Sequence, residues 1–196
     1  MSKVRLYGAT SGYVELAAPD VSPDATLTLP STSGGFGKLV AVKHALKTDT
    51  QTESSVGAGG NFAVTDLSIT HTLADASNKL IVSAYFGVAA NAIGNGNVGL
   101  AIADGGTLIA TGAAAGNRTL VGAGGLVSQS ASYIVSMPSV TFVYEPGDTA
   151  SHTYTVRAIN LYSSTQTIYI NRSESDSDTS EYSRGSSGFV IQEVAA

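Results

Sequence analysis

The chain has no cysteine and no tryptophan, and it is poor in charged and aromatic residues. Without cysteine it forms neither disulfides nor thiolate metal sites. Charged residues make up 13% of its 196 residues, about half the usual ~25%, and the few basic ones are scattered. This pattern argues against nucleic-acid binding, which needs a basic stripe. No apolar run approaches the ~20 residues of a membrane span, and the N-terminus has no apolar export segment, so we expect no membrane partner and assembly in the cytoplasm.

Small side chains dominate the apolar content of the sequence. Hydrophobic residues make up 43% of the chain, but aromatic residues only 7%, and much of the remainder is alanine. Burial stabilises by roughly 25 cal/mol per Å² of apolar surface, so an alanine-rich core contributes little per residue. A chain of this length forms one domain, or one domain with an arm. We therefore expect a homo-oligomer that buries additional surface between its subunits.

Short runs of β-branched and aromatic residues, separated by glycine, proline or polar residues, recur along the chain. No segment shows a clean apolar period of 3.6 residues, so we expect almost no helix. Many short strands with glycine-rich connections indicate an all-β protein, either a sandwich or a jelly roll. The segment 79–88 is the most apolar, and we expect it to be buried on both faces. The predicted strands are residues 39–46, 64–73, 79–88, 98–103, 107–111, 120–128, 133–144, 153–161, 166–171 and 188–194.

The first thirty residues have the pattern of a separate arm. Strand-like residues at 4–7 and 13–16 flank a glycine-bounded turn, which predicts a β-hairpin, and residues 25–29 alternate again. Strands this short do not form a core alone. A Gly/Ser-rich joint, STSGGFG, follows. The predicted organisation is an arm over residues 1–30, a joint over residues 31–37 and a β-sandwich over residues 38–196.

Residues 172–188 form a long polar loop before the last predicted strand, and long loops are often functional. Alternating acids with serines suit a hard cation, but the glycine of an EF-hand is missing, so a solvated loop is the favoured interpretation and no cofactor is expected. Arg172 and Arg184 flank the acids and are candidates to pair with them or with a neighbouring subunit. The weak calcium candidates are Glu174, Asp176, Asp178 and Glu181.

Two tyrosines near predicted loop ends, Tyr162 and Tyr182, are candidates for a sugar-stacking or protein-contact surface. Packing in the core or between subunits is the more common role of such residues. Together with Arg172 and Arg184, they are the candidate ligand or subunit contacts.

Other motifs give weaker signals. The G-x-G-x-x-G pattern at residues 94–99 runs into another strand-like segment, so it predicts a turn and not a dinucleotide site. His44, His71 and His152 lie in or beside different strands without a second ligand nearby. Three copies of one histidine around a trimer axis would suit zinc or nickel, but packing is the favoured interpretation. No catalytic carboxylate pair or triad is selected by the sequence, so we expect no enzymatic activity.

Several segments together resemble tailed-phage fibre and virion surface proteins, especially those of aquatic phages. The first segments resemble the N-terminal region of those proteins, and the later ones resemble their C-terminal β-domain. The segments are residues 12–19 (GYVELAAP), 25–30 (ATLTLP), 39–50 (LVAVKHALKTDT), 116–119 (GNRT), 168–173 (IYINRS) and 190–196 (VIQEVAA).

The resemblance implies a trimeric, jelly-roll protein of the virion surface without enzymatic activity, assembled in the host cytoplasm. Fibres of this kind usually carry a long shaft, whereas here the arm leads straight into one domain. That departure favours a capsid decoration (cement) protein or short head fibre, which binds the major capsid protein or tail components. The alternative is a tail fibre that recognises host polysaccharide through the loop at 172–188. The residues expected to anchor the arm are Val4, Leu6, Tyr13, Val14 and Leu16.

Overall fold

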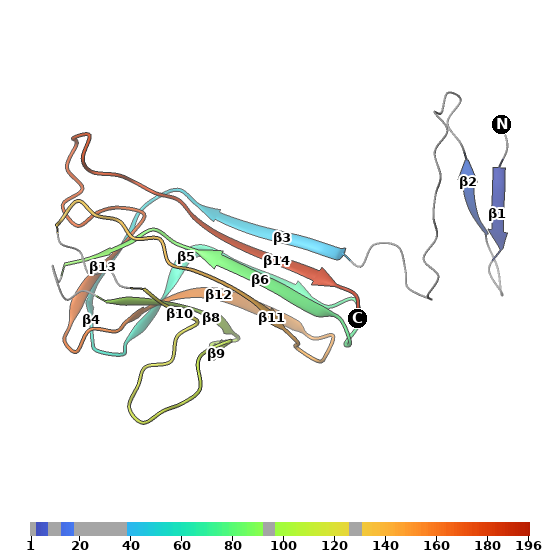
Figure 1. The fold of residues 1–196 in the computed structure, drawn as a ribbon, viewed down its shortest axis with the longest axis horizontal. Helices are drawn as coiled ribbons and strands as arrows, with labels where there is room; N and C mark the ends of the chain where they lie inside the picture. Colours follow the sequence, from blue (N-terminus) through green and yellow to red (C-terminus); the bar gives the residue numbers. More distant parts are fainter. Residues whose placement is uncertain (1–2, 8–12, 18–38, 92–96, 126–130) are drawn as a thin grey trace. The chain divides into compact units, whose positions relative to one another are not determined.

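The computed structural model describes residues 3–7, 13–17, 39–91, 97–125 and 131–196 (Figure 1). The chain divides into two units, Met1–Phe36 and Gly37–Ala196. Every regular element in the described ranges is a strand, as expected from the sequence. Accordingly, these ranges contain no helix long and apolar enough to cross a membrane.

The first unit contains an antiparallel hairpin of β1 (Lys3–Tyr7) and β2 (Tyr13–Ala17). Directly opposed residues of an antiparallel pair share one face. The register pairs Val4 with Leu16 and Leu6 with Val14, so these four positions lie on one face of the hairpin. Tyr13 pairs with Tyr7 and lies on the other face. The third strand expected at residues 25–29 lies outside the described residues.

The second unit contains three antiparallel sheets. The first sheet has the order β11 (Ser139–Tyr144), β6 (Lys79–Tyr85), β14 (Ser187–Val194), β3 (Leu39–Lys47). The second has the order β10 (Ala123–Gly125), β8 (Val98–Asp104), β12 (Ser151–Asn160), β5 (Asn61–Thr72), with β9 (Thr107–Ile109) paired to β8. The third, smaller sheet has the order β4 (Gln51–Val56), β13 (Gln166–Ile170), β7 (Val88–Ala90).

The two larger sheets have the nested connectivity of a jelly roll. Strand β3 pairs with the last strand, β14, and β5 pairs with β12. In the same nested way β6 pairs with β11, and β8 pairs with β10. Eight strands folded back on themselves in this order form the two Greek keys of a jelly roll. The predicted fold class is therefore confirmed.

The core lies between the two larger sheets and follows the alternation of their strands. Leu80, Val82 and Ala84 of β6 are buried, while the residues between them are partly exposed. The expectation that this segment is buried on both faces is therefore wrong. Strand β8, in contrast, is buried on both faces over most of its length, as is the short strand β7. Val121 covers the outer side of β8. It fills the space that a side chain at Gly99 would need, because a Cβ added to Gly99 would lie 2.5 Å from Val121.

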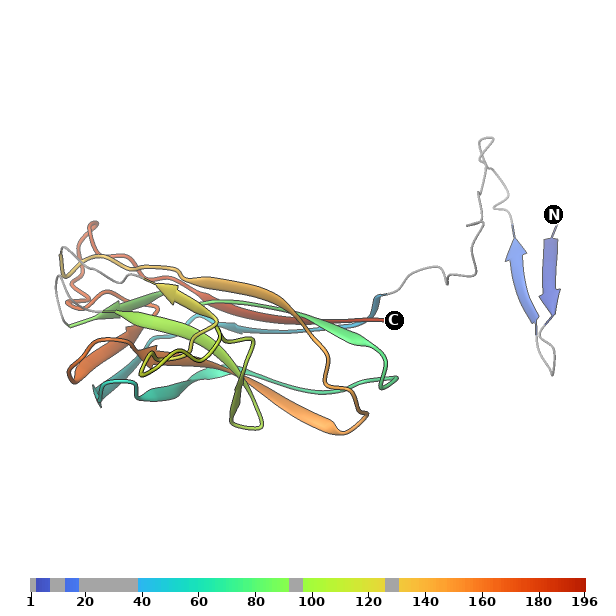
Figure 2. The same cartoon turned by 60° about the horizontal axis from the view of Figure 1, so that its bottom comes forward.

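The domain has two distinct ends (Figure 2). Leu39, at the start of β3, pairs with Val194 near the end of the last strand, and we call this the proximal end. At the opposite end Lys47 pairs with Ser187, where β14 begins. The connection between β13 and β14 therefore lies at this distal end, away from the point where the chain enters the domain.

Candidate functional site

Residues 172–186, which follow Asn171 in the connection between β13 and β14, are called here the distal loop. Its two ends are held together, because Arg172 and Arg184 form an antiparallel bridge and the amide of Gly185 donates to the carbonyl of Asn171 at 3.1 Å. Compact surface loops with adjacent ends are frequently functional. The loop is therefore a defined structure on the distal end.

An ion pair fixes the interior of the distal loop. The guanidinium of Arg184 donates to both carboxylate oxygens of Asp176, and Nη1 of Arg172 lies 3.7 Å from the same carboxylate. The Arg184 guanidinium holds the pKa of Asp176 below its usual value. Arg172 also donates to the carbonyl of Glu174 at 2.7 Å and covers the ring of Tyr169 at 4.5 Å. Sequence spacing alone indicated that arginines and acids of this loop were candidates to pair.

An open groove of about 390 Å³ lies on the distal loop. One of its walls is the half-buried ring of Tyr182, which meets Tyr133 edge-on with ring centroids 6.2 Å apart. The groove is lined by Asp176, Ser177, Asp178, Thr179, Tyr182 and Arg184. We refer to it as the distal groove.

The structure separates the sequence-predicted contact residues into two groups. Tyr182 and Arg184 line the distal groove, whereas Arg172 supports it from its base and Tyr162 lies apart, directly after β12. The amide of Tyr162 donates to Oδ1 of Asn160.

The weak calcium candidates are not assembled into a metal site. Asp176 and Asp178 line the groove, while Glu174 and Glu181 do not. Asp176 is engaged by Arg184, which supplies the positive charge that a cation would supply. Among the described residues, no three His, Asp or Glu side chains are grouped so that they could hold a metal ion.

Asn171 lies directly beneath the distal loop and joins three strand ends. Its Nδ2 donates to the carbonyls of Lys47 and Asp49, each at 3.0 Å, and its Oδ1 accepts from the hydroxyl of Ser187. The residue is buried and has a left-handed φ of 60°, a conformation in which asparagine is several-fold enriched. Asn171 therefore ties the ends of β3 and β13 to the start of β14.

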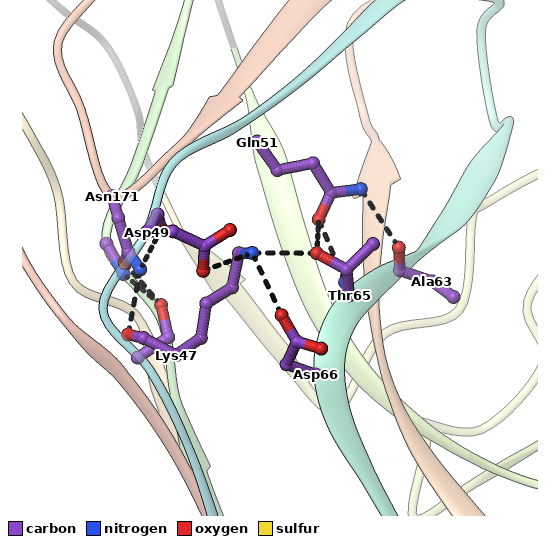
Figure 3. Close-up of polar contacts among 9 residues, drawn as sticks. Lys47, Asp49, Gln51, Ala63, Thr65, Asp66 and Asn171 are labelled. Carbon is purple, nitrogen blue, oxygen red and sulfur yellow. Dashed lines mark hydrogen bonds and ion pairs between the residues drawn. The ribbon is translucent and has the colours of Figure 1, made fainter.

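A buried lysine connects the two large sheets at the same end (Figure 3). Nζ of Lys47 donates to Thr65 at 2.7 Å and to Asp49 at 2.9 Å, and it lies 3.7 Å from Asp66. Asp66 is in the left-handed region, at φ 63°, where β5 bulges against β12. The sequence analysis missed this cluster, although strand alternation places Lys47 on the same face as the inward Ala45.

The three histidines occupy separate environments. His44 is exposed on β3. His71 is buried, with Nε2 2.9 Å from Glu193, and the same carboxylate accepts from the amide of Ala74 and from Asn78. These bonds hold the end of the last strand at the proximal end.

His152 lies between two aspartates. Its Nδ1 is 2.8 Å from Asp104, and its Nε2 is 3.0 Å from Asp148. Tyr144 also donates to Asp104, at 3.0 Å. The hydrogen bond to Asp148 has the largest effect and raises the pKa of His152. The Asp104 carboxylate raises this pKa as well, while burial of the ring opposes the shift. The arrangement joins β8, β12 and the turn before β12.

The outer face of the first sheet exposes several large hydrophobic side chains, and we call it the apolar face, although Ser83 and Thr141 also form an exposed hydroxyl pair there. Of the large hydrophobic side chains exposed among the described residues, six lie on strands of this sheet, while Tyr133 and Met137 lie in the segment before β11, where Tyr133 contacts Tyr182. The exposed side chains are Leu39, Val40, Val42, Leu46, Tyr85, Tyr133, Met137 and Val143. The second sheet also presents hydroxyl pairs to solvent, Ser68 with Thr155 and Thr70 with Thr153, but among the described residues its strands expose no large hydrophobic side chain.

Two sets of sequence-predicted residues have no described side-chain environment. The five anchoring candidates lie on the hairpin of β1 and β2, where only the strand register is described. Gly94 and Gly96 of the G-x-G-x-x-G pattern lie outside the described residues.

No protein-family model and no curated protein sequence matches this chain. Solved structures of infectious bursal disease virus are similar in part. The Gt strain structure gives a TM-score of 0.41 at 15% identity and covers 97% of this chain and 46% of that chain. The Gx strain structure gives 0.40 at 13% identity, with 94% and 44% covered. This chain thus spans less than half the length of those chains, and at these TM-scores the likeness is too loose to indicate a function.

Proposed function

We propose that this chain is a non-enzymatic virion structural protein, a capsid decoration protein or short head fibre that assembles as a homotrimer. Its N-terminal hairpin would bind the major capsid protein or a tail component, and its jelly-roll domain would project from the virion surface. The sequence resemblance to phage virion proteins supports this role. Jelly rolls are also a common architecture of viral capsid and lectin domains.

The observation that carries the proposal is the apolar face. Exposed large hydrophobic side chains that gather on one face of a sheet can mark a protein interface. Here Val40, Val42 and Leu46 line one edge of the sheet and Val143 lies on the opposite edge strand. Packing these faces against neighbouring copies would remove them from water and would so stabilise the assembly. The core itself is built mainly of Val, Leu, Ile and aromatic side chains and is not dominated by alanine.

The hairpin supports the anchoring part of the proposal. An isolated two-stranded hairpin is marginally stable in water, so β1 and β2 need a surface to pack against. The shared face of Val4, Leu6, Val14 and Leu16 is the side suited to an apolar contact on a capsid. Tyr13 lies on the opposite face of the hairpin, so it would help to anchor the arm only if that face also contacted the partner.

The oligomeric part is tested by sedimentation of the recombinant chain and of a variant carrying Val42→Lys and Val143→Lys. We expect the wild type at three times the 19.8 kDa chain mass and the variant as a folded monomer. Thr153→Lys, on the hydroxyl-lined sheet, is the matched control and should remain trimeric. A monomeric wild type would contradict the trimer, and a trimeric double variant would contradict the use of the apolar face.

The anchoring part is tested by deletion of residues 1–30. The shortened chain should remain a soluble trimer but should no longer co-sediment with capsids. Retained capsid binding would show that the hairpin is not the anchor.

The receptor-binding alternative, in which the chain recognises host polysaccharide, is favoured by one observation. The distal groove lies at the end of the domain opposite the point where the chain enters it. A domain attached at its proximal end would hold this groove away from the virion.

A further inference from the structure

We propose that the distal groove binds a neutral carbohydrate, one or two pyranose units in size. The proposal deepens the receptor-binding alternative by assigning the site and the chemical class of its ligand. It does not depend on the anchoring of the hairpin or on the trimer.

The dimensions of the groove suit a small ligand. Its volume of about 390 Å³ lies near the lower end of the roughly 300–1,000 Å³ that ligand pockets occupy. The groove is open and lies on the surface of a loop, so a sugar within a longer chain would be able to enter it without a free end. This geometry suits recognition of a polysaccharide better than enclosure of a whole small molecule.

The lining has the mixture of groups that sugars require. A sugar hydroxyl donates and accepts hydrogen bonds at the same time. Asp178 offers a carboxylate acceptor, and Arg184, whose Nε and Nη2 already bind Asp176, keeps the donors of Nη1 beside it, which together match a pair of neighbouring hydroxyls. Tyr182 adds an aromatic surface on which the apolar C–H face of a pyranose packs.

The charge of the lining selects against acidic ligands. Two aspartates face one arginine, so the groove carries a net charge of −1 from Asp176, Asp178 and Arg184. Asp178 is exposed and makes no hydrogen bond among the described residues, so its carboxylate is available to a ligand. Phosphate, sulfate and sialic acid would meet this carboxylate, whereas hexoses and N-acetylhexosamines would donate to it.

The distal loop is ordered before any ligand arrives. Asp176 is held by Arg184, its amide donates to Ser173, and the amide of Tyr182 donates to Thr179 at 3.1 Å. A loop already fixed in this way loses less conformational entropy on binding than a flexible one. The groove therefore has the rigidity that weakly interacting sugar ligands need.

The test uses the full chain on an array of neutral hexose and N-acetylhexosamine oligosaccharides, with sialylated and sulfated glycans as the acidic arm. We expect the wild type to bind glycans of the neutral arm. Asp178→Asn and Tyr182→Leu should each lower the affinity about tenfold, which is the loss expected when one charge-assisted or stacking contact is removed. Asp178→Asn removes no internal hydrogen bond, so it separates ligand contact from folding.

Two matched variants serve as controls. Glu181→Gln removes an acid from the same loop, and Tyr162→Leu removes a tyrosine from the neighbouring connection, but neither residue lines the groove. Both should bind as the wild type does. Absence of binding to any neutral glycan, binding confined to acidic glycans, or equal binding by the wild type and Asp178→Asn would each overturn the proposal. Because capsid attachment is measured separately, a negative glycan result would leave the virion role standing.

Discussion

Arg184 holds Asp176 through two parallel hydrogen bonds, 3.0 Å from Nε to Oδ1 and 2.8 Å from Nη2 to Oδ2. Lysine cannot reproduce this fork, because its ammonium is a point charge. Arg184→Lys should therefore loosen the distal loop while leaving the thermal midpoint of the domain nearly unchanged, since exposed ion pairs contribute little to global stability. Hydrogen exchange of the amides between residues 173 and 185 would report the change. Arg118→Lys, in another exposed loop, is the control, and an unchanged exchange rate would show that the fork is dispensable.

Glu193 should make the domain sensitive to acid. Burial alone would raise the pKa of Glu193, but hydrogen bonds from Asn78 and Ala74 and the contact with His71 together hold this pKa below its usual value. Its stabilising contribution is therefore present above the pKa of an unfolded glutamate and is lost as the pH falls through the folded-state pKa. Glu193→Gln should cost about 2 kcal/mol at neutral pH, because one buried acceptor is replaced by a donor facing His71.

Urea unfolding at a series of pH values measures this effect. The unfolding free energy of Glu193→Gln should fall less steeply on acidification than that of the wild type. Glu145→Gln, which removes an exposed partner of Lys79, should follow the wild-type curve. Parallel curves for the wild type and Glu193→Gln would contradict the assignment.

His152 should have the opposite pH dependence. Its pKa is raised, first by Asp148 and also by Asp104. A raised pKa means that the charged ring stabilises the folded state below the unfolded-state value of 6.5 and that this contribution disappears as the pH rises through the folded-state pKa. The imidazole resonances of His152 should titrate above this value in an NMR experiment. Asp148→Asn should lower that midpoint, and an unshifted titration in the wild type would refute the ion-pair cluster.

The two demands on Asn171, its hydrogen bonds and its left-handed backbone, are separable by substitution. Asn171→Gly keeps the conformational freedom but leaves the carbonyls of Lys47 and Asp49 without their buried donor, which should cost about 2 kcal/mol. Asn171→Ala adds the strain of a positive φ and should cost about 1 kcal/mol more. Thermal and urea unfolding of both variants would give the difference. Equal stabilities would mean that the backbone relaxes out of the left-handed region.

Alternation of side chains made most of the fold predictable. Strands such as β5 and β14 show a clear inward and outward pattern, and the jelly roll follows from their number and spacing. Strand β4 was missed because its sequence, QTESSV, is polar and resembles a loop. Its edge position in the small sheet tolerates such residues, since only one of its sides pairs with another strand.

The candidate site was predictable in part. The polarity and length of the distal loop marked it as functional, and Tyr182 and Arg184 were both named from sequence. The role of Asn171 was not readable, because the two carbonyls that accept from its side chain lie more than a hundred residues away in the sequence. The apolar face was likewise not predictable, because a sequence pattern does not distinguish an exposed valine from a core valine. Val40 and Val42 are exposed because they lie on the edge strand β3 and nothing in the described residues covers its outer side.

The pairing of Leu39 with Val194 has a practical consequence for engineering. A reporter fused after Ala196 would emerge beside the start of β3, at the proximal end of the domain. A peptide inserted at the other end belongs in the short β12–β13 connection, around residues 162–165. This connection follows the distal end of β12, because the opposite end of that strand pairs with Thr72, next to the His71–Glu193 contact at the proximal end. The proximal and distal ends of the domain therefore offer two separate places, one for a terminal fusion and one for an inserted peptide.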